Sequence, residues 1–304
     1  MGLFSFNKEI AIDLGTANTI IIHNDKIVID EPSIVAIEVR TGKMVAVGKE
    51  AQQMHGKENE NIRTIRPLRQ GVIADFNAAE MMIRGLVSKA CSKNRWFNPS
   101  MRMVVGIPSG STEVEIRAVR DSSEHAGGRD VYMLYEPMAA ALGIGIDVVA
   151  PEGNMIVDIG GGTTEIAVIS LGGIVASKSV RVGGDEFDAA IISYIKRKYN
   201  LLIGERSAEA IKMTIGSAFP FEEELEMEIK GRNLVDGLPK NMFITSEEIR
   251  DALSDPLSSI MDAIKSTLER TPPELSADII DHGITLTGGG SLLLYTERSP
   301  PADR

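Results

Sequence analysis

The chain has few residues of the kinds that mark several common protein classes. Its 304 residues include one cysteine and one tryptophan, and aromatic residues make up only 5%. A single cysteine, Cys91, cannot build an internal disulfide framework and is typical of a reducing cytoplasm. No apolar run approaches the ~18 residues of a membrane-spanning helix, and the first ten residues do not resemble a signal peptide. We therefore expect a cytoplasmic protein.

An excess of positive charge is also missing. Lys and Arg total 32 against 43 Asp and Glu, which gives a formal net charge of −11. Such a chain would be repelled by nucleic acid and has no overall basic character to hold it on an anionic membrane. Its hydrophobic content of 43% is ordinary for a globular protein,. Because 304 residues exceed one compact core, we expect two domains,.

What the sequence does contain is one pattern in two copies. Residues 10–19 read IAIDLGTANT and residues 155–164 read MIVDIGGGTT, and the two align without a gap. Each is a strand pattern that delivers an Asp, Asp13 or Asp158, into a turn of glycine and small or hydroxyl residues. Either copy alone is most simply an ordinary β-hairpin. Two copies indicate a duplicated fold with a site in the cleft between its halves.

The residue types of these hairpins suit a nucleotide. Small turn residues let backbone N–H groups approach a phosphate closely. The carboxylates of Asp13 and Asp158 suit a hard cation such as Mg²⁺, which prefers carboxylate and phosphate oxygens. We therefore predict that the two hairpins together hold the phosphates of a nucleotide and its metal ion.

The remaining pattern alternates between strands and helices and predicts an α/β fold. Asn77 is expected to cap a helix that ends near residue 90, and Ser207 to cap the helix that carries Glu209 and Lys212. A helix and a loop are expected over residues 49–67. Further helices are expected over 111–126, 186–198 and 246–270, and strands over 19–23, 26–29, 33–39, 71–75, 102–107, 131–134, 173–182 and 283–287.

Three further places in the sequence are candidates for the site, and each has a plainer alternative. Glu136, at a strand-to-helix junction, is either a first-turn carboxylate or a residue that orients water at the terminal phosphate. Glu209 and Lys212 are i, i+3 neighbours that form an exposed ion pair or contact the ribose. The glycine triplet before Ser291 is either a plain loop or a contact for adenine or ribose.

Two apolar segments stand out in a chain poor in aromatics. Trp96 and Phe97 lie together in a basic segment, and Leu3, Phe4 and Phe6 lie near the start. The aromatic pair either packs beneath its loop or contacts a lipid surface.

The whole chain resembles the actin, heat-shock-chaperone and sugar-kinase superfamily, and more closely the MreB family of bacterial actins, which organise rod-shaped cell growth. The resemblance covers residues 8 to about 293. It rests on segments 13–19, 31–33, 71–75, 108–110, 136–141, 158–165, 202–206, 271–276 and 286–291.

This resemblance implies an actin-like ATPase fold of two duplicated domains, each with a mixed five-stranded sheet flanked by helices and each with a smaller subdomain. The expected domains are 1–143, with a subdomain over about 32–74, and 144–304, with a subdomain over about 183–243. It also implies Mg²⁺–ATP binding and slow hydrolysis coupled to the assembly of filaments from copies of the chain. The filaments would lie at the inner face of the cell membrane with the cell-wall elongation machinery as partner.

The resemblance also assigns roles to residues. Asp13 and Asp158 would hold Mg²⁺, and Glu136 with Thr163 would position the attacking water. The membrane contacts would be Leu3, Phe4, Phe6, Trp96 and Phe97. The nucleotide contacts would be Asp13, Gly15, Thr16, Ala17, Asn18, Gly160, Gly161, Gly162, Thr163, Glu205, Arg206, Ala208, Glu209, Lys212, Gly288, Gly289, Gly290 and Ser291.

The chain departs from the family pattern after Leu293. The family is expected to continue there through a helix, a strand and a closing helix, whereas residues 294–304 are polar and contain Pro300 and Pro301. This segment resembles a truncation, and we expect the second domain to be incomplete at its C-terminus.

Two other functions share the superfamily. A sugar-type kinase would need a catalytic Asp near the second phosphate loop, where this chain offers Glu136 instead. A chaperone would need a substrate-binding domain after the ATPase.

Overall fold

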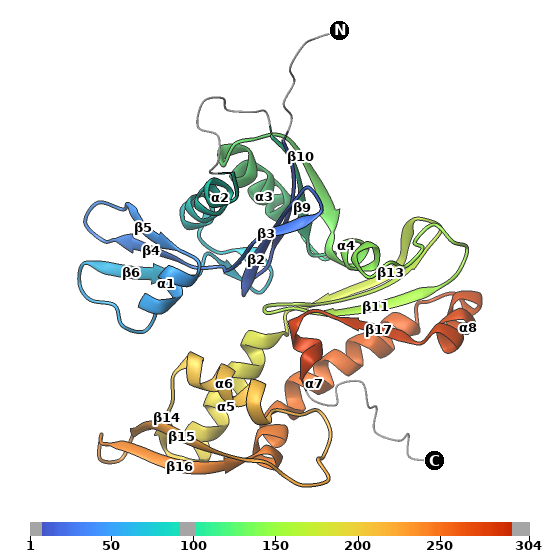
Figure 1. Ribbon diagram of the computed structural model, residues 1–304. Coiled ribbons are helices and arrows are strands. Elements are labelled where there is room, and N and C mark those ends of the chain that lie inside the picture. Colours follow the sequence, from blue (N-terminus) through green and yellow to red (C-terminus); the bar gives the residue numbers. More distant parts are fainter. Residues whose placement is uncertain (1–7, 92–100, 294–304) are drawn as a thin grey trace. The chain divides into compact units, whose positions relative to one another are not determined.

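The computed structural model describes residues 8–91 and 101–293, and the chain divides into two units, residues 1–143 and 144–304 (Figure 1). The five residues that are expected to contact a membrane all lie outside the described residues. They are Leu3, Phe4, Phe6, Trp96 and Phe97. None of the described helices combines the length and the apolar character that a membrane crossing requires.

Unit 1 is built on a five-stranded sheet with strand order β10-β9-β1-β2-β3. Strands β1, β2 and β3 form an antiparallel meander, whereas β9 runs parallel to β1 and β10 runs parallel to β9. Apolar residues alternate along these strands, which places one face in the core,. The bounds are β1 Lys8–Leu14, β2 Asn18–His23, β3 Lys26–Pro32, β9 Met101–Ile107 and β10 Gly128–Tyr135.

Helices α2 (Phe76–Cys91) and α3 (Glu113–His125) lie side by side on this sheet (Figure 1). Their apolar residues form one core cluster with the inward residues of the strands. Thr112 caps α3 in a capping box with Glu115,. The prediction for α2 was wrong by two residues, because Asp75 rather than Asn77 accepts the N–H of Ala78, at 3.0 Å.

A smaller sheet with strand order β5-β4-β6 and helix α1 belongs to the same unit. The sequence predicts a helix and a loop over 49–67, and the structure places a strand at the end of that stretch. The bounds are β4 Val35–Glu38, β5 Met44–Val47, α1 Lys49–Met54 and β6 Ile62–Ile65, followed by the short pair β7 Leu68–Arg69 and β8 Val72–Ile73, and by α4 Glu136–Gly143 directly after β10.

Unit 2 also begins with an antiparallel meander, and the first hairpin of that meander has the same register as in unit 1. Asp13 pairs with Ile20 across β1 and β2, and Asp158 pairs with Glu165 across the equivalent strands. The sheet order is β13-β12-β11-β17, with β17 parallel to β11. The described residues supply four strands to this sheet, where five are expected from the sequence. The bounds are β11 Asn154–Ile159, β12 Thr164–Ser170, β13 Gly173–Val180 and β17 Ile284–Thr287.

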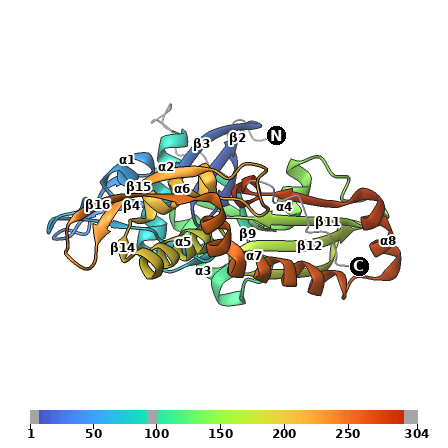
Figure 2. The ribbon, with the colours of Figure 1, turned by 90° about the horizontal axis from the view of Figure 1, so that it is seen from below.

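Helices α5 (Gly184–Tyr199) and α7 (Ser246–Leu268) belong to the core of unit 2, and α7 runs along β12 and β13 (Figure 2). A three-stranded sheet of β14 (Leu201–Leu202), β15 (Glu226–Asn233) and β16 (Pro239–Thr245) adjoins α6. The sequence did not reveal β15, β16 or α8 (Pro273–His282), because their short apolar patterns are interrupted by charged residues. Helix α6 (Glu205–Ile215) begins after Gly204, so the prediction of Ser207 as its cap was wrong.

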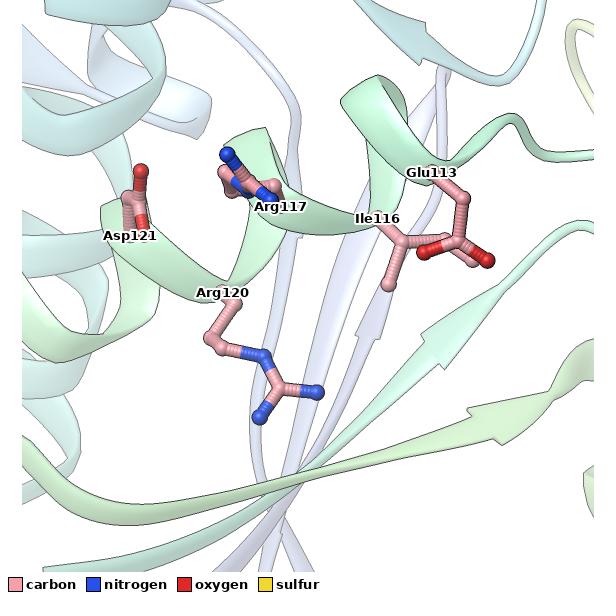
Figure 3. A pocket seen from close by; sticks show the side chains of 5 residues that line it. All are labelled: Glu113, Ile116, Arg117, Arg120 and Asp121. Carbon is pink, nitrogen blue, oxygen red and sulfur yellow. The ribbon is translucent and has the colours of Figure 1, made fainter.

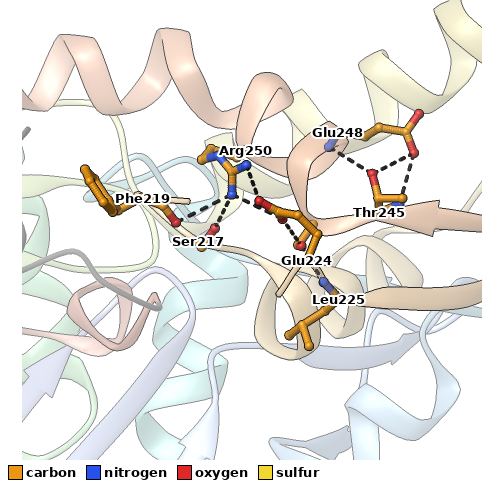
Figure 4. A network of polar contacts seen from close by, with 8 residues as sticks. Ser217, Phe219, Glu224, Leu225, Thr245, Glu248 and Arg250 are labelled. Carbon is orange, nitrogen blue, oxygen red and sulfur yellow. Dashed lines mark hydrogen bonds and ion pairs between the residues drawn. The ribbon is translucent and has the colours of Figure 1, made fainter. Parts of the chain in front are cut away.

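Arg250 joins α7 to the segment that leads into β15 (Figure 4). Its guanidinium contacts both carboxylate oxygens of Glu224, at 2.7 and 3.4 Å, and donates to Ser217 Oγ at 3.2 Å. Hydrogen bonds from Arg250 and then from Ser246 lower the pKa of Glu224. This arrangement satisfies a half-buried cation with several acceptors, and it fixes a stretch that has no regular secondary structure of its own.

We expect Arg250→Met to lower the free energy of unfolding by about 1–3 kcal/mol, because Glu224 and Ser217 lose their partner. The loss should become smaller as the pH falls below the pKa of Glu224 in the unfolded chain. Because the pKa of Glu224 is lowered in the folded protein, its contribution to stability is present above the unfolded pKa and disappears as the carboxylate is protonated,. Chemical denaturation at pH 7 and pH 3.5 measures both effects. Arg197→Met, at an exposed position of α5, is the control, and equal losses for the two variants would contradict the role of this network.

Candidate functional site

The turn between β1 and β2 is tightly held by its neighbours. The hydroxyl of buried Thr16 accepts the N–H of Gly71 at 2.9 Å. Ser33 donates from its hydroxyl to the Gly15 carbonyl at 2.6 Å and from its backbone N–H to the Ala17 carbonyl at 2.8 Å. A side chain at Gly15 would lie 2.6 Å from the Asn18 carbonyl oxygen, so only glycine fits this turn,. The turn is therefore fixed from both ends.

Asp13, Gly106 and Glu136 lie at the carboxyl ends of the three parallel strands β1, β9 and β10. A Cβ atom placed on Gly106 would lie 3.5 Å from Glu136 Cγ and 4.0 Å from the Asp13 Cα atom, so the three residues are neighbours. Ligands of open α/β sheets bind at this edge. Asp13 has access to solvent, but the protein atoms around its carboxylate partly desolvate it and raise its pKa,.

The second turn, residues 160–163, is held mainly by backbone. The Gly160 N–H donates to the Thr163 carbonyl at 2.8 Å. The first N–H groups of α5 reach the same turn, since Gly184 donates to the Gly160 carbonyl at 3.0 Å and Asp185 to the Gly161 carbonyl at 2.8 Å. The start of α5 thus forms part of the support of the phosphate loop that the sequence predicts.

The glycine triplet lies directly against Asp158. Strand β17 pairs with β11 so that Thr287 is opposite Asp158, and Gly288 follows with a φ of 81°. A Cβ atom on Gly288 would lie 2.3 Å from Asp158 Oδ1 and 2.5 Å from the Ile159 carbonyl oxygen. Gly289 and the following residues form a short 3₁₀ turn, in which Ser291 Oγ donates to the Gly288 carbonyl at 2.7 Å. The backbone of the triplet therefore packs directly against the carboxylate of Asp158.

Helix α6 is linked to α5 by an ion pair that the sequence did not predict. Lys212 Nζ lies 2.9 Å from Asp188 Oδ1 and donates to the Gly184 carbonyl at 3.1 Å. The geometry at Oδ1 is that of an ion pair rather than of a well-directed hydrogen bond. The ion pair of Lys212 is thus with Asp188, and not with Glu209 as the plainer interpretation of the sequence had it.

The other predicted residues of α6 differ in their exposure. Glu205, Arg206 and Glu209 face solvent on the helix, and α6 begins at Glu205. Ala208 is fully buried in the core of unit 2, so its methyl group supports the helix and is not open to a ligand. Asp188 was missed because one Asp in the middle of a helix pattern carries no motif, and its partner lies on another helix.

The predicted residues fall into two groups, one in each unit. In unit 1, Asp13, the turn after it and Glu136 lie together at one edge of the five-stranded sheet. In unit 2, Asp158, its turn and the glycine triplet lie together at an edge of the four-stranded sheet. Among the described residues there is no cluster of three or more His, Cys, Asp or Glu that could hold a metal by itself. This donor set fits Mg²⁺, which commonly uses one or two carboxylates and takes its remaining ligands from phosphate and water.

A groove of about 320 Å³ lies elsewhere, on the surface of α3 (Figure 3). Its lining residues all belong to that helix, and none of them is a predicted site residue. They are Glu113, Ile116, Arg117, Arg120 and Asp121. The groove therefore does not mark the predicted nucleotide site.

The comparisons with known sequences agree over nearly the whole chain. Residues 7–298 match the family described as MreB/Mbl protein. The chain is 50% identical over 289 residues to the cell shape-determining protein Mbl of Bacillus cereus, which covers 95% of this chain and 86% of that protein. It is also 50% identical over 298 residues to the cell shape-determining protein MreB of Escherichia coli, with coverage of 96% and 86%.

Solved structures give the same result. The crystal structure of MreB 5 of Spiroplasma citri bound to AMPPNP is similar with a TM-score of 0.89 and 42% identity, covering 96% of this chain and 87% of that one. A MamK double helical filament has a TM-score of 0.79 at 21% identity, with coverage of 95% and 88%, which is a likeness of fold alone.

The close approach of Gly288 to Asp158 can be tested by substitution. We expect Gly288→Ala to lower the free energy of unfolding by at least about 1–3 kcal/mol, because the methyl group meets Asp158 and Ile159 and the positive φ disfavours alanine,. Gly289→Ala is the matched control, since a Cβ there has no neighbour within 4 Å, and it should change stability by less than about 0.5 kcal/mol,. Thermal unfolding of the two variants decides this. Equal stability would show that the close approach is not maintained in solution.

Proposed function

This chain belongs to the MreB/Mbl protein family and has the actin-like fold, and on that premise we propose that it is an ATP-binding bacterial actin. It would bind Mg²⁺–ATP, hydrolyse it slowly and assemble with copies of itself into filaments that contribute to cell shape. The family relationship favours this function over the sugar-type kinase.

The observation that carries the proposal is the repeated meander. In both units an Asp stands near the end of the first strand, in the same pairing register with the second, and is followed by a turn that neighbouring backbone holds in place. A turn fixed in this way presents its N–H groups without reorganisation when a phosphate arrives. We propose that the phosphates contact Gly15, Thr16, Ala17 and Asn18 in unit 1 and Gly160, Gly161, Gly162 and Thr163 in unit 2.

The metal ion would be held by few protein groups. Asp13 and Asp158 are the carboxylates that would face it, directly or through water, with the remaining ligands from phosphate and water. The ion would neutralise phosphate charge and so favour departure of the terminal phosphoryl group. A cation at Asp13 would also remove the cost of keeping that partly desolvated carboxylate charged, which is the cause of its raised pKa,.

The nucleoside would contact the second unit. The exposed side of α6 offers hydrogen-bonding groups for ribose hydroxyls on Glu205, Arg206 and Glu209. Lys212 is on the same helix and is less exposed. The backbone of Gly288, Gly289 and Gly290, with Ser291, offers a flat surface without side chains against which an adenine ring could lie.

Glu136 is the residue that we assign to the hydrolytic step. It begins α4 at the end of β10, beside Asp13, where the positive end of the helix dipole favours its charged form,. A carboxylate held there can accept a hydrogen bond from water and orient it toward the terminal phosphate. Thr163, at the closing position of the second turn, would be the other positioning group.

Assembly and membrane contact complete the proposed function. The MamK relative is a double helical filament, and the MreB 5 relative binds AMPPNP, so self-assembly and nucleotide binding both occur on this fold. We propose the inner face of the cell membrane as the place of assembly, through Trp96 and Phe97 and through Leu3, Phe4 and Phe6. The cell-wall elongation machinery would be the partner there.

Electron microscopy of the purified chain with Mg²⁺–ATP, with and without lipid vesicles, tests the proposal as a whole. We expect nucleotide-dependent filaments that associate with the vesicles. Replacing Trp96 and Phe97 together by Ser should reduce the fraction that pellets with vesicles several-fold and leave filaments in solution. Absence of filaments with every nucleotide tried would contradict the assembly function, and unchanged pelleting of the double variant would remove the aromatic pair from the membrane contact.

A second experiment addresses hydrolysis. Glu136→Ala should lower phosphate release by about 10²–10⁴-fold, because the attacking water loses its orienting acceptor, while the affinity for ATP changes little. Glu113→Ala, an exposed carboxylate in the first turn of α3, is the matched control and should have no effect. Phosphate release and nucleotide binding are measured on the same preparations. Unchanged turnover in Glu136→Ala would exclude this residue from the reaction.

A further inference from the structure

Asp188 is a buried carboxylate with a position that its neighbours explain only in part. It lies in the second turn of α5, and 14% of its side chain is exposed. Lys212, which is 17% exposed, approaches it from α6 to 2.9 Å. An ion pair that is mostly shielded from water loses much of its attraction to desolvation, so the pair is not explained by stability alone,.

The surroundings of Asp188 disfavour its charged form. Burial raises its pKa to about 6, against the opposing effect of Lys212. Glu209 on α6 and Asp185 on its own helix act in the same direction as burial. At neutral pH the carboxylate is charged although its surroundings disfavour that charge. Strained charges of this kind concentrate at functional sites.

The contacts of the pair lead step by step to the phosphate loop. Lys212 donates to the Gly184 carbonyl at 3.1 Å while it pairs with Asp188. Gly184 in turn donates its N–H to the Gly160 carbonyl, and the next residue donates to Gly161. The approach of the two segments is close, since a Cβ on Gly183 would lie 2.6 Å from the Gly160 oxygen. Four short contacts therefore join α6 to the turn that follows Asp158.

We propose that Asp188 is a positioning residue for the nucleotide, which acts through Lys212 and the start of α5 on the phosphate loop 160–163. It anchors Lys212 so that the ammonium group holds the Gly184 carbonyl and keeps the first turn of α5 against the loop. The same anchor fixes α6, so the helix of the nucleoside contacts and the loop of the phosphate contacts form one assembly. This inference rests on the proposed nucleotide site.

The pair also makes the assembly sensitive to acid. Protonation of Asp188 removes the charge that holds Lys212, and the pKa of about 6 places this change between about pH 7 and pH 5,. Above that range the pair is charged and the loop is anchored, and below it Lys212 is released. Nucleotide affinity should therefore contain a component that is present at neutral pH and lost on acidification.

The test compares the affinity for Mg²⁺–AMPPNP of the wild type and Asp188→Asn by calorimetry at pH 7.5 and pH 5. At pH 7.5 we expect Asp188→Asn to bind on the order of tenfold more weakly, a typical coupling between sites. At pH 5 the two proteins should bind within about twofold of each other, because the wild-type carboxylate is then neutral as well. Comparing the proteins at each pH cancels the titration of the nucleotide itself.

Two controls separate this effect from general charge changes. Asp251→Asn on α7 removes an exposed carboxylate, as a control for Asp188, and Lys196→Met on α5 removes an exposed ammonium group, as a control for Lys212. Both variants should bind AMPPNP like the wild type at each pH. Lys212→Met provides a second route to the same effect. A double variant with Asp188→Asn should lose no more affinity than Lys212→Met alone, because Asp188 acts through Lys212.

Hydrogen exchange gives a readout that does not depend on affinity. In Asp188→Asn the amides of Gly184 and Asp185 should exchange faster, while those in the middle of α5 remain protected. If Asp188→Asn binds like the wild type at both pH values, or if these amides do not change, the inference is wrong while the nucleotide site stands. A wild type that binds no AMPPNP at all would overturn the proposed function together with this inference.

Discussion

The close backbone contact around the turn after Asp158 is the constraint on which the second unit depends. Three segments far apart in the sequence meet there, namely the turn 160–163, the start of α5 and the glycine triplet after β17. They can meet only because Gly183 and Gly288 carry no side chain, since a Cβ at either position would lie within 2.6 Å of a backbone or carboxylate oxygen. Helix α5 begins at this junction and contributes Phe187, Ile191 and Ile195 to the core of the unit.

The first unit reaches an equivalent result by different means. Its turn after Asp13 is held by hydroxyl groups, with Thr16 and Ser33 bonded to backbone groups of other segments. One turn is thus fixed by side chains and the other mainly by main chain, although both follow the same strand pairing. For the proposed function this matters because contacts within the protein itself hold both turns, so little ordering entropy is lost on binding,.

The second unit contains two partly buried ion pairs that differ in character, Arg250 with Glu224 and Lys212 with Asp188. Arg250 and Glu224 fix the segment before β15 by several well-satisfied contacts, which is the usual way in which a half-buried charge stabilises a fold,. Asp188 and Lys212 instead form an ion pair in which burial outweighs attraction, as the raised pKa of Asp188 shows. The first arrangement is typical of structural support, and the second of a place where stability is exchanged for a fixed geometry beside a site.

Much of this protein could be predicted from the sequence by itself. The gap-free match between residues 10–19 and 155–164 indicated the duplication, and the pattern of apolar residues predicted β2, β9 and β17 within one position. The family resemblance is confirmed by the comparisons. Periodicity suffices for the strands, because it reflects the local alternation of side chains along a strand.

Only the tertiary structure showed the pairing of Asp188 with Lys212, the place of Gly288 against Asp158, and strands β15 and β16. The partners in these contacts come from distant segments, and no local pattern marks them. Asp188 has the sequence context of an ordinary residue of an amphipathic helix, and its burial depends on α6 lying across it. Such positions are set by how helices and strands pack, because burial and the pKa are properties of the surroundings and not of the residue type.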